Sequence, residues 1–556
     1  MDTPARAERA RRGRTPAGHR AHPVPCTRTH TRARWIFRLP SAVLPFPPRA
    51  DPTRPIGGTD PVISVDRGQN APRTRAPVGA RTWPAAAFAT AALAAALGAG
   101  TWFAWWFPLA LVVGFLVLLA AIAWMRWIAV RDARAVIVLW LVSALNRPIA
   151  LVVPEALRRS VLYLDDIALA SALAVLLLTG VRLVPATRSM AVAYLGFGLF
   201  LVSGVVGAVL AGTSLTVTAL GTWLALKLFV YLLITTQFHW TERDLRLAAR
   251  AAAALIVLVL SVAALQWVAP GPVSTILGVE QRTRLGQGVI SSIFVHPGQY
   301  STFMMFALAL LLARYPLTPR RMGSVLVVGA AAMLSLRLKS LVDIVLLTAT
   351  RVAISPSKFV KAGAPVVLLS GVTAAALFGS ALVSARVGDL FVSPHASPRE
   401  VLYVTSARIA QDFFPFGGGF GSFGSAASLI EPSLLYSEYG LTGVYGLSPD
   451  APLFVHDASW ATTLGEGGLL GAAGLLLAMG ALLVTAWKRA HVAGSTRKDQ
   501  AARATLLFAV AFLNDSLSTT QLFVGFSCLT LAVLLSISLD SSTPAPPKLR
   551  REAKVL

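Results

Sequence analysis

The sequence predicts an all-α polytopic membrane protein with about 12–14 transmembrane helices and one long extracytoplasmic loop. Of its 556 residues, 55 % are hydrophobic and only 13 % are charged, whereas about a quarter of a soluble domain is charged. From Ala85 onward, apolar runs near the 20 residues that a spanning helix needs alternate with short polar breaks. The sequence shows neither a strand-rich segment nor a repeat of fixed period. This composition excludes an ordinary soluble enzyme, a disordered regulator and a fibrous protein.

Residues 1–82 are expected to be a disordered cytoplasmic tail. They hold 16 Arg, 13 Pro and 5 acidic residues, and proline at this density disfavours both helix and sheet. The first long apolar stretch begins near Ala85, so a cleaved secretory signal is not expected. A solvated tail, or an upstream start codon chosen in error, is favoured over a tail that binds anionic lipid or RNA.

The polytopic membrane domain is predicted to cover residues 83–540, followed by a second basic cytoplasmic tail over 541–556. Several of its apolar runs are short or separated by thin turns, which leaves the number of spans between 12 and 14. The expected spans are roughly 85–101, 106–125, 135–153, 167–181, 189–211, 214–236, 251–270, 298–313, 322–336, 340–353, 363–384, 458–486, 504–518 and 521–538.

The distribution of positive charge supports this topology in the plasma membrane. With the Arg-rich tail inside and 14 spans, every inside connection is basic, as the positive-inside rule requires. The two longest breaks, about 271–297 and about 385–457, then fall outside. The second break contains nine aromatic residues and many glycines between Tyr403 and Tyr445, which argues against disorder.

Several basic residues oppose this rule because they lie on the predicted outer side. They occur in the first outer loop, in the short stretch 335–340, at the start of the long loop and near Asp165: Arg282, Arg284, Arg337, Lys339, Arg386, Arg158 and Arg159. Cations beside a span are costly and often mark a substrate pathway. Any one of them could snorkel or pair with an acid. Taken together, they favour an anion site, because guanidinium groups bind phosphate oxygens bidentately.

Two histidines and three carboxylates are further candidates for the site. His296 precedes Pro297 and Gly298 at the mouth of a span, where a lone histidine is more often structural than catalytic. His456 and Asp457 close the long loop, and Asp457 can act as a general base, orient a sugar hydroxyl or cap a helix. Glu466 is expected inside the membrane with an arginine as its partner. Asp412 lies in the long loop.

Other common site types find little support in the sequence. Cys26 and Cys528 lie at opposite ends of the chain and suggest neither a disulfide framework nor a thiolate metal site, and no cofactor is expected. Gly419, Gly421 and Gly424 fit a dinucleotide fingerprint formally. The preceding strand that would give this pattern its meaning is missing, so a tight backbone turn beneath a ligand site is the better interpretation.

The order of these motifs resembles the O-antigen ligase and polysaccharide polymerase family of bacterial envelopes. The hydropathy pattern is similar over roughly residues 100–540, and the matching motifs themselves contain about 60 residues. Residues 401–471 are most similar to polymerases, because ligases of the family typically have Asn or Ser after the histidine where this chain has Asp457. The motifs are Arg284-Leu-Gly286, Phe294-Val-His296-Pro297, Ser335–Ser340, Asp412-Phe-Phe-Pro415 with Gly417–Gly421 and Phe423, and His456-Asp457 with Trp460, Glu466-Gly467 and Gly471.

The resemblance implies a membrane glycosyltransferase that joins glycans carried on polyprenyl diphosphate at the outer face of the membrane. Arg284, Arg337 and Arg386 would stabilise the leaving diphosphate, and Asp457 or His456 would orient or deprotonate the acceptor hydroxyl. A flippase and a chain-length regulator of the same pathway are expected partners, and nucleic acid is not. A transporter or flippase is the leading alternative, although the two halves of the chain show no matching repeats. A non-catalytic envelope scaffold is the third.

Overall fold

A computed structural model of the protein describes residues 115–181, 187–279, 281–284, 287–314, 318–355, 397–431, 433–448 and 451–540. All of them belong to one compact unit, Ala95–Leu556. The expected tails, the spans at 85–101 and 363–384, and Arg386 lie outside the described residues.

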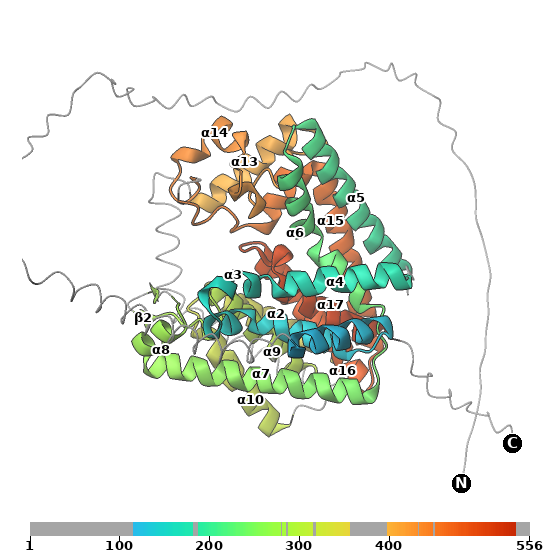
Figure 1. The fold of residues 1–556 in the computed structure, drawn as a ribbon. Helices are drawn as coiled ribbons and strands as arrows, with labels where there is room; N and C mark the ends of the chain where they lie inside the picture. The colour runs from blue at the N-terminus through green and yellow to red at the C-terminus, as the bar shows by residue number, and fades with distance from the viewer. Residues whose placement is uncertain are drawn as a thin grey trace, which may run out of the picture. The chain divides into compact units, whose positions relative to one another are not determined.

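The described residues form α-helices joined by short turns, and the only sheet among them is a two-stranded antiparallel hairpin (Figure 1). The hairpin consists of β1 (Thr283–Arg284) and β2 (Gln287–Gly288). The all-α class predicted from the hydropathy pattern is therefore confirmed. The helices are α2 (Arg134–Val152), α3 (Glu155–Leu162), α4 (Leu164–Thr179), α5 (Arg188–Leu210), α6 (Leu215–Thr235), α7 (Glu242–Val268), α8 (Pro270–Ile276), α9 (Pro297–Leu312), α10 (Pro319–Met333), α11 (Leu338–Ala353), α13 (Pro398–Asp412), α14 (Leu434–Glu438), α15 (Ser459–Val492), α16 (Arg497–Ser516) and α17 (Gly525–Leu539).

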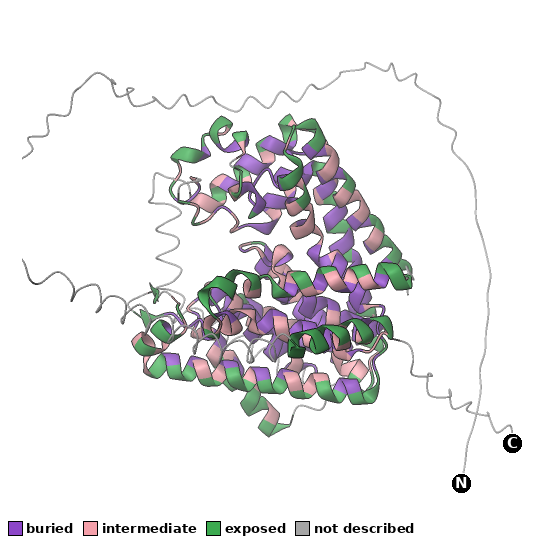
Figure 2. Ribbon diagram, viewed as in Figure 1, coloured by how far each residue is buried: buried purple, intermediate pink, exposed green. Residues whose placement is uncertain are grey.

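Five described helices, namely α2, α5, α6, α7 and α15, are long and apolar enough to cross a bilayer. The pair α3 and α4, bent by 50°, makes a sixth if it counts as one span, and Phe115–Ala129, α9 and α17 are shorter apolar helices. Large apolar side chains on α7 remain exposed, among them Val257 and Trp267, as expected for a surface that faces lipid (Figure 2). The multi-pass membrane character is confirmed. The count of 12–14 spans remains a prediction.

Small residues allow α5 and α15 to pack closely along their length. Gly196 of α5 and Gly474 of α15 face each other so closely that a Cβ on Gly474 would lie 2.7 Å from the Gly196 carbonyl oxygen. Ser203 Oγ donates to the Gly467 carbonyl at 2.7 Å. Close backbone approach at small residues, with hydroxyl bonds across helices, is typical of packing inside a membrane.

The glycine-rich stretch 417–421 is inserted against these two helices. Its backbone amides at Gly418 and Gly419 donate to the carbonyls of Gly465 and Glu466 at 2.8 and 2.9 Å. At this point α15 is kinked, because Gly468 has φ 59° and ψ −164°, a conformation essentially restricted to glycine. The stretch is indeed a tight turn, and what it contacts is helix backbone.

The described part of the long predicted loop is ordered. Helices α13 and α14 and two 3-10 turns enclose a small apolar core of their own that includes Leu402, Phe423 and Tyr436. This agrees with the aromatic content of the segment. Its C-terminal end leads directly into α15, which places Asp457 close to the start of a spanning helix.

Candidate functional site

Arg337 is buried at the start of α11 and is only 6 % exposed. Its guanidinium lies over the first turn of α9, where Gly298 leaves room for it, since a Cβ on Gly298 would collide with Nη1. Among the described residues, Nη1 has no hydrogen-bond partner. Buried polar groups are normally paired, so this donor could bind an anionic ligand.

The backbone before Arg337 is held in an unusual conformation. Leu336 has φ 46°, in the left-handed region that a leucine rarely adopts. Two contacts fix this turn: Ile290 N–H donates to the Leu334 carbonyl at 3.2 Å, and Arg284 Nη1 donates to the Leu336 carbonyl at 3.4 Å. The β1–β2 hairpin thereby brings Arg284, and with it Arg282, towards Arg337.

His296 is the N-cap residue of α9, and its Nδ1 accepts a hydrogen bond from Gly298 N–H at 3.0 Å. Burial, together with the positive charges of Arg337 and Arg282, lowers the pKa of His296 to about 4. The ring is therefore neutral at physiological pH. With Nδ1 accepting, Nε2 carries the proton, so His296 can donate a hydrogen bond to a substrate oxygen.

Arg337, Arg284, Arg282 and His296 form a group that we call the arginine cluster. Asp457, at the end of the predicted long loop, acts on this cluster as well. Its Oδ2 accepts from Arg399 Nη2 at 2.7 Å, and Arg399 lies in the first turn of α13. The negative charge of Asp457 acts on both His296 and Arg337. Arg399 was not among the predicted site residues, because only the fold of the loop shows that it faces Asp457.

The cluster has an excess of positive charge. Burial, and to a lesser extent the neighbouring cations Arg284 and Arg399, lowers the pKa of Arg337 to about 10, although Asp515 and Asp457 oppose this shift. Arg337 therefore remains charged at neutral pH. Each of the two carboxylates already holds another cation, so a bound anion would relieve the repulsion.

Lys339 does not face the cluster as a free cation. Its Nζ forms an ion pair with Asp515 Oδ1 at 2.7 Å, and both side chains are buried. Asp515 Oδ2 also accepts from Thr302 Oγ1 at 2.6 Å, and Gln521 Nε2 donates to the same hydroxyl at 2.7 Å. This buried network joins α9, α11 and α16 directly behind Arg337. Lys339 therefore holds together the helices behind Arg337.

The structure separates three predicted residues from the cluster. His456 and Glu466 line a cavity of about 150 Å³ between α6 and α15, so His456 and Asp457 face different surroundings. Glu466 Oε1 accepts from Phe423 N–H at 3.3 Å, so its partner is a loop amide where an arginine was expected. Asp412 accepts from Tyr439 Oη at 2.6 Å, at the opposite end of α13 from Arg399.

A cavity of about 310 Å³ lies beside the start of α9. Val295 and Gln299, which flank the His296 turn, line it. Ser143 and Asp165 line it from α2 and α4, with Ser143 Oγ donating to Asp165 Oδ2 at 3.3 Å. This is a volume at the lower end for ligand pockets, and its hydroxyl, amide and carboxylate groups suit a hydroxylated ligand.

Asp166, one of the acids near Arg158 and Arg159 in the sequence, forms its ion pair with a lysine of another helix. Asp166 Oδ1 pairs with Lys227 Nζ of α6 at 2.7 Å and accepts from Trp223 Nε1 at 3.0 Å. Arg158 Nε instead donates to the Ala150 carbonyl at 3.3 Å. Among the described residues, no group of three His, Cys, Asp or Glu side chains could hold a metal ion.

The depressed pKa of His296 predicts a pH dependence of stability. Its ordinary value is 6.5 and its folded value is about 4, so the unfolded chain binds this proton more readily. The stabilisation from neutral His296 is fully present above pH 6.5 and is lost as the pH falls towards 4. We expect the wild-type thermal midpoint in detergent to fall more over this range than that of His296→Gln, which keeps a side-chain acceptor for Gly298. Parallel curves for the two proteins would contradict this assignment.

No protein-family model matches the chain, and no curated protein matches its sequence. The functional interpretation therefore rests on the chain's own residues.

Proposed function

We propose that the protein is a membrane glycosyltransferase that polymerises or ligates oligosaccharide units carried on polyprenyl diphosphate, at the extracytoplasmic face of the plasma membrane. Arg337 supports this most directly, because its buried Nη1 has no hydrogen-bond partner among the described residues and can donate to a bound anion. Arg284, Arg282 and neutral His296 lie around it, and the two carboxylates that act on it, Asp515 and Asp457, each pair with another cation.

The residues present suit substitution at an anomeric carbon. The bond between sugar C1 and the diphosphate oxygen breaks, and its electron pair leaves with the diphosphate. The acceptor hydroxyl oxygen forms the new bond to C1 and gives its proton to the Asp457 carboxylate. Arg337 and Arg284 stabilise the charge that develops on the leaving diphosphate, and His296 Nε2–H donates to one of its oxygens.

The position of the cluster suits a substrate that is part lipid and part sugar. His296 lies at the start of the apolar helix α9 and Arg337 at the start of α11, while Arg399 of α13 reaches the cluster through Asp457 from a segment with an aromatic core. The prenyl chain would lie among the helices, and the glycan would lie between the arginine cluster and α13. A flippase that delivers the lipid-linked unit and a regulator of chain length are the partners that such a reaction needs.

Deletion of the gene, followed by analysis of cell-surface polysaccharide and of lipid-linked intermediates, tests this proposal. Loss of a polymerase leaves single repeat units on the lipid carrier on the outer side. Loss of a ligase leaves normal polymer that is missing only from its final anchor. Intermediates trapped on the cytoplasmic side would instead identify a flippase and contradict the proposal.

A further inference from the structure

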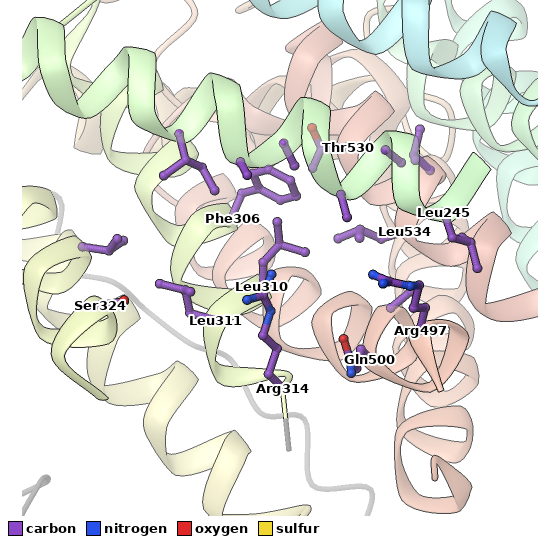
Figure 3. Close-up of a pocket in the computed structure, with 18 of the residues that line it drawn as sticks. Leu245, Phe306, Leu310, Leu311, Arg314, Ser324, Arg497, Gln500, Thr530 and Leu534 are labelled. Carbon is purple, nitrogen blue, oxygen red and sulfur yellow. The ribbon is translucent and has the colours of Figure 1, made fainter. Parts of the chain in front are cut away.

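A third cavity lies at the other end of the helices, away from the arginine cluster. Its volume is about 710 Å³, and it is lined by α2, α7, α9, α10, α16 and α17. Phe306, Leu310 and Leu311 of α9 form one wall, and Arg314 follows the end of that helix (Figure 3). His296 precedes the start of the same helix of 16 residues, so about 24 Å of helix separates His296 from the Arg314 end of the cavity.

Small residues line part of the cavity on two helices. On α7 these are Ala248, Ala249, Ala252 and Ala253, beside the larger Leu245, Ile256, Val257 and Leu260. On α10, a Cβ added to Gly323 would meet no atom within 4 Å. Larger apolar side chains at these positions would close the space between α7, α9 and α10.

The polar groups of the cavity gather near one end. Figure 3 shows the side chains of Arg314 and Arg497 pointing into it from the end of α9 and the start of α16, with Gln500 beside them. Arg497 Nε lies 3.7 Å from Glu242 Oε2, but both side chains are about half exposed, and such pairs contribute little. Among the described residues, none forms an ion pair with Arg314.

This end of the helices is also where basic side chains cap helix ends. Arg351 Nε donates to the Leu312 carbonyl at 2.7 Å, and Arg503 Nη1 donates to the Ala313 carbonyl at 3.1 Å. The ends of α9 and α11 and the start of α16 therefore lie together, and the exposed Arg314 and Arg320 make the surface at this end basic. By the positive-inside rule this surface faces the cytoplasm, where anionic lipids add a negative potential.

We propose that this cavity binds an anionic phospholipid of the cytoplasmic leaflet, with an acyl chain between α7, α9 and α17 and the phosphate at Arg314 and Arg497. An apolar chain-sized space that ends in two guanidinium groups matches the two parts of such a lipid. The site is independent of the glycosyltransferase reaction, because it lies at the opposite end of α9.

Native mass spectrometry of the full-length protein in detergent, with added phosphatidylglycerol or phosphatidylcholine, tests this site. We expect phosphatidylglycerol to be retained over phosphatidylcholine. Arg314→Ala and Arg497→Ala should each weaken phosphatidylglycerol retention about five-fold, since a basic residue near a lipid surface contributes about 1 kcal/mol. Arg320→Ala is the matched control, because Arg320 is an exposed arginine at the same end that does not line the cavity.

The chain-binding part has its own matched pair of variants. Ala253 and Ala254 are adjacent, exposed residues of α7, and only Ala253 lines the cavity. Ala253→Phe should expel the bound lipid, whereas Ala254→Phe should retain it. Inorganic phosphate distinguishes the lipid from a free anion, because phosphate at millimolar concentration should not displace phosphatidylglycerol. Equal retention of the two lipids, equal retention by the two phenylalanine variants, or displacement by phosphate would each overturn the proposal.

Discussion

Replacing Arg337 with alanine is expected to reduce polymer formation by at least a hundred-fold without lowering the stability of the protein. Loss of a single preorganised donor to a developing negative charge typically costs a hundred- to a thousand-fold in rate. The thermal midpoint should stay constant or rise, because the variant removes a buried cation from a cluster that is already positive, and its Nη1 has no hydrogen-bond partner among the described residues. The measurements are the chain length of the polysaccharide and the thermal midpoint of the purified protein.

Arg320→Ala serves as the control for Arg337→Ala. It removes a guanidinium that is exposed at the opposite end of the helices, so polymer should remain full-length. A purely structural role for Arg337 predicts the reverse pattern for the alanine variant, with a lower thermal midpoint and activity that falls only with protein amount. That outcome would remove Arg337 from the site.

Replacing Asp515 with alanine is expected to have the largest effect on stability. Asp515 is fully buried and pairs with Lys339 at 2.7 Å, so the variant leaves a buried ammonium without its counter-charge. Breaking one side of a buried ion pair costs about 3–5 kcal/mol. The thermal midpoint in detergent and the monodisperse fraction in size-exclusion chromatography measure this loss.

A double variant separates loss of charge from loss of packing at the same position. Lys339→Met combined with Asp515→Leu replaces both charges with apolar side chains of similar length, and such a replacement is often neutral or stabilising. We therefore expect the double variant to be clearly more stable than Asp515→Ala. If the two variants unfold at the same temperature, the ion pair does not hold α11 against α16.

The fold class was predictable because the bilayer imposes a length and a hydropathy that are visible in the sequence. Hydropathy does not decide whether segments such as α9 and α17 cross the bilayer, because they are apolar but shorter than a full span. Buried polar residues in or beside them, for example Thr302 of α9 and Gln521 in the turn before α17, belong to networks whose partners are remote in sequence. A hydropathy profile cannot show that pairing.

The candidate site was predictable where a residue broke a rule. Arg284, Arg337 and Arg282 were noticed because they oppose the positive-inside bias, and the structure places them around His296. Lys339 broke the same rule but pairs with Asp515, a partner that only tertiary packing reveals. His456 and Asp457 are neighbours in sequence, yet one lines a cavity beside Glu466 and the other faces Arg399. The turn that divides them is not visible in the residue pattern.

Arg399 shows why the long segment was the hardest part to predict. In the sequence, Arg399 looks like any other charged residue of a loop. Its role depends on the packing of α13, which brings the first turn of that helix to Asp457. The glycine-rich stretch was expected beneath a ligand and instead pairs with the backbone of kinked α15. In both cases the fold of the segment decides the contact, and local propensity does not encode it.

The most direct test is to reconstitute the purified protein in liposomes with a polyprenyl-diphosphate-linked repeat unit and to measure two products together. We predict release of polyprenyl diphosphate in step with lengthening of the lipid-linked glycan, and loss of both with Arg337→Ala. Movement of intact lipid-linked units across the bilayer, with no free polyprenyl diphosphate and no longer glycan, would contradict the proposal and identify a transporter.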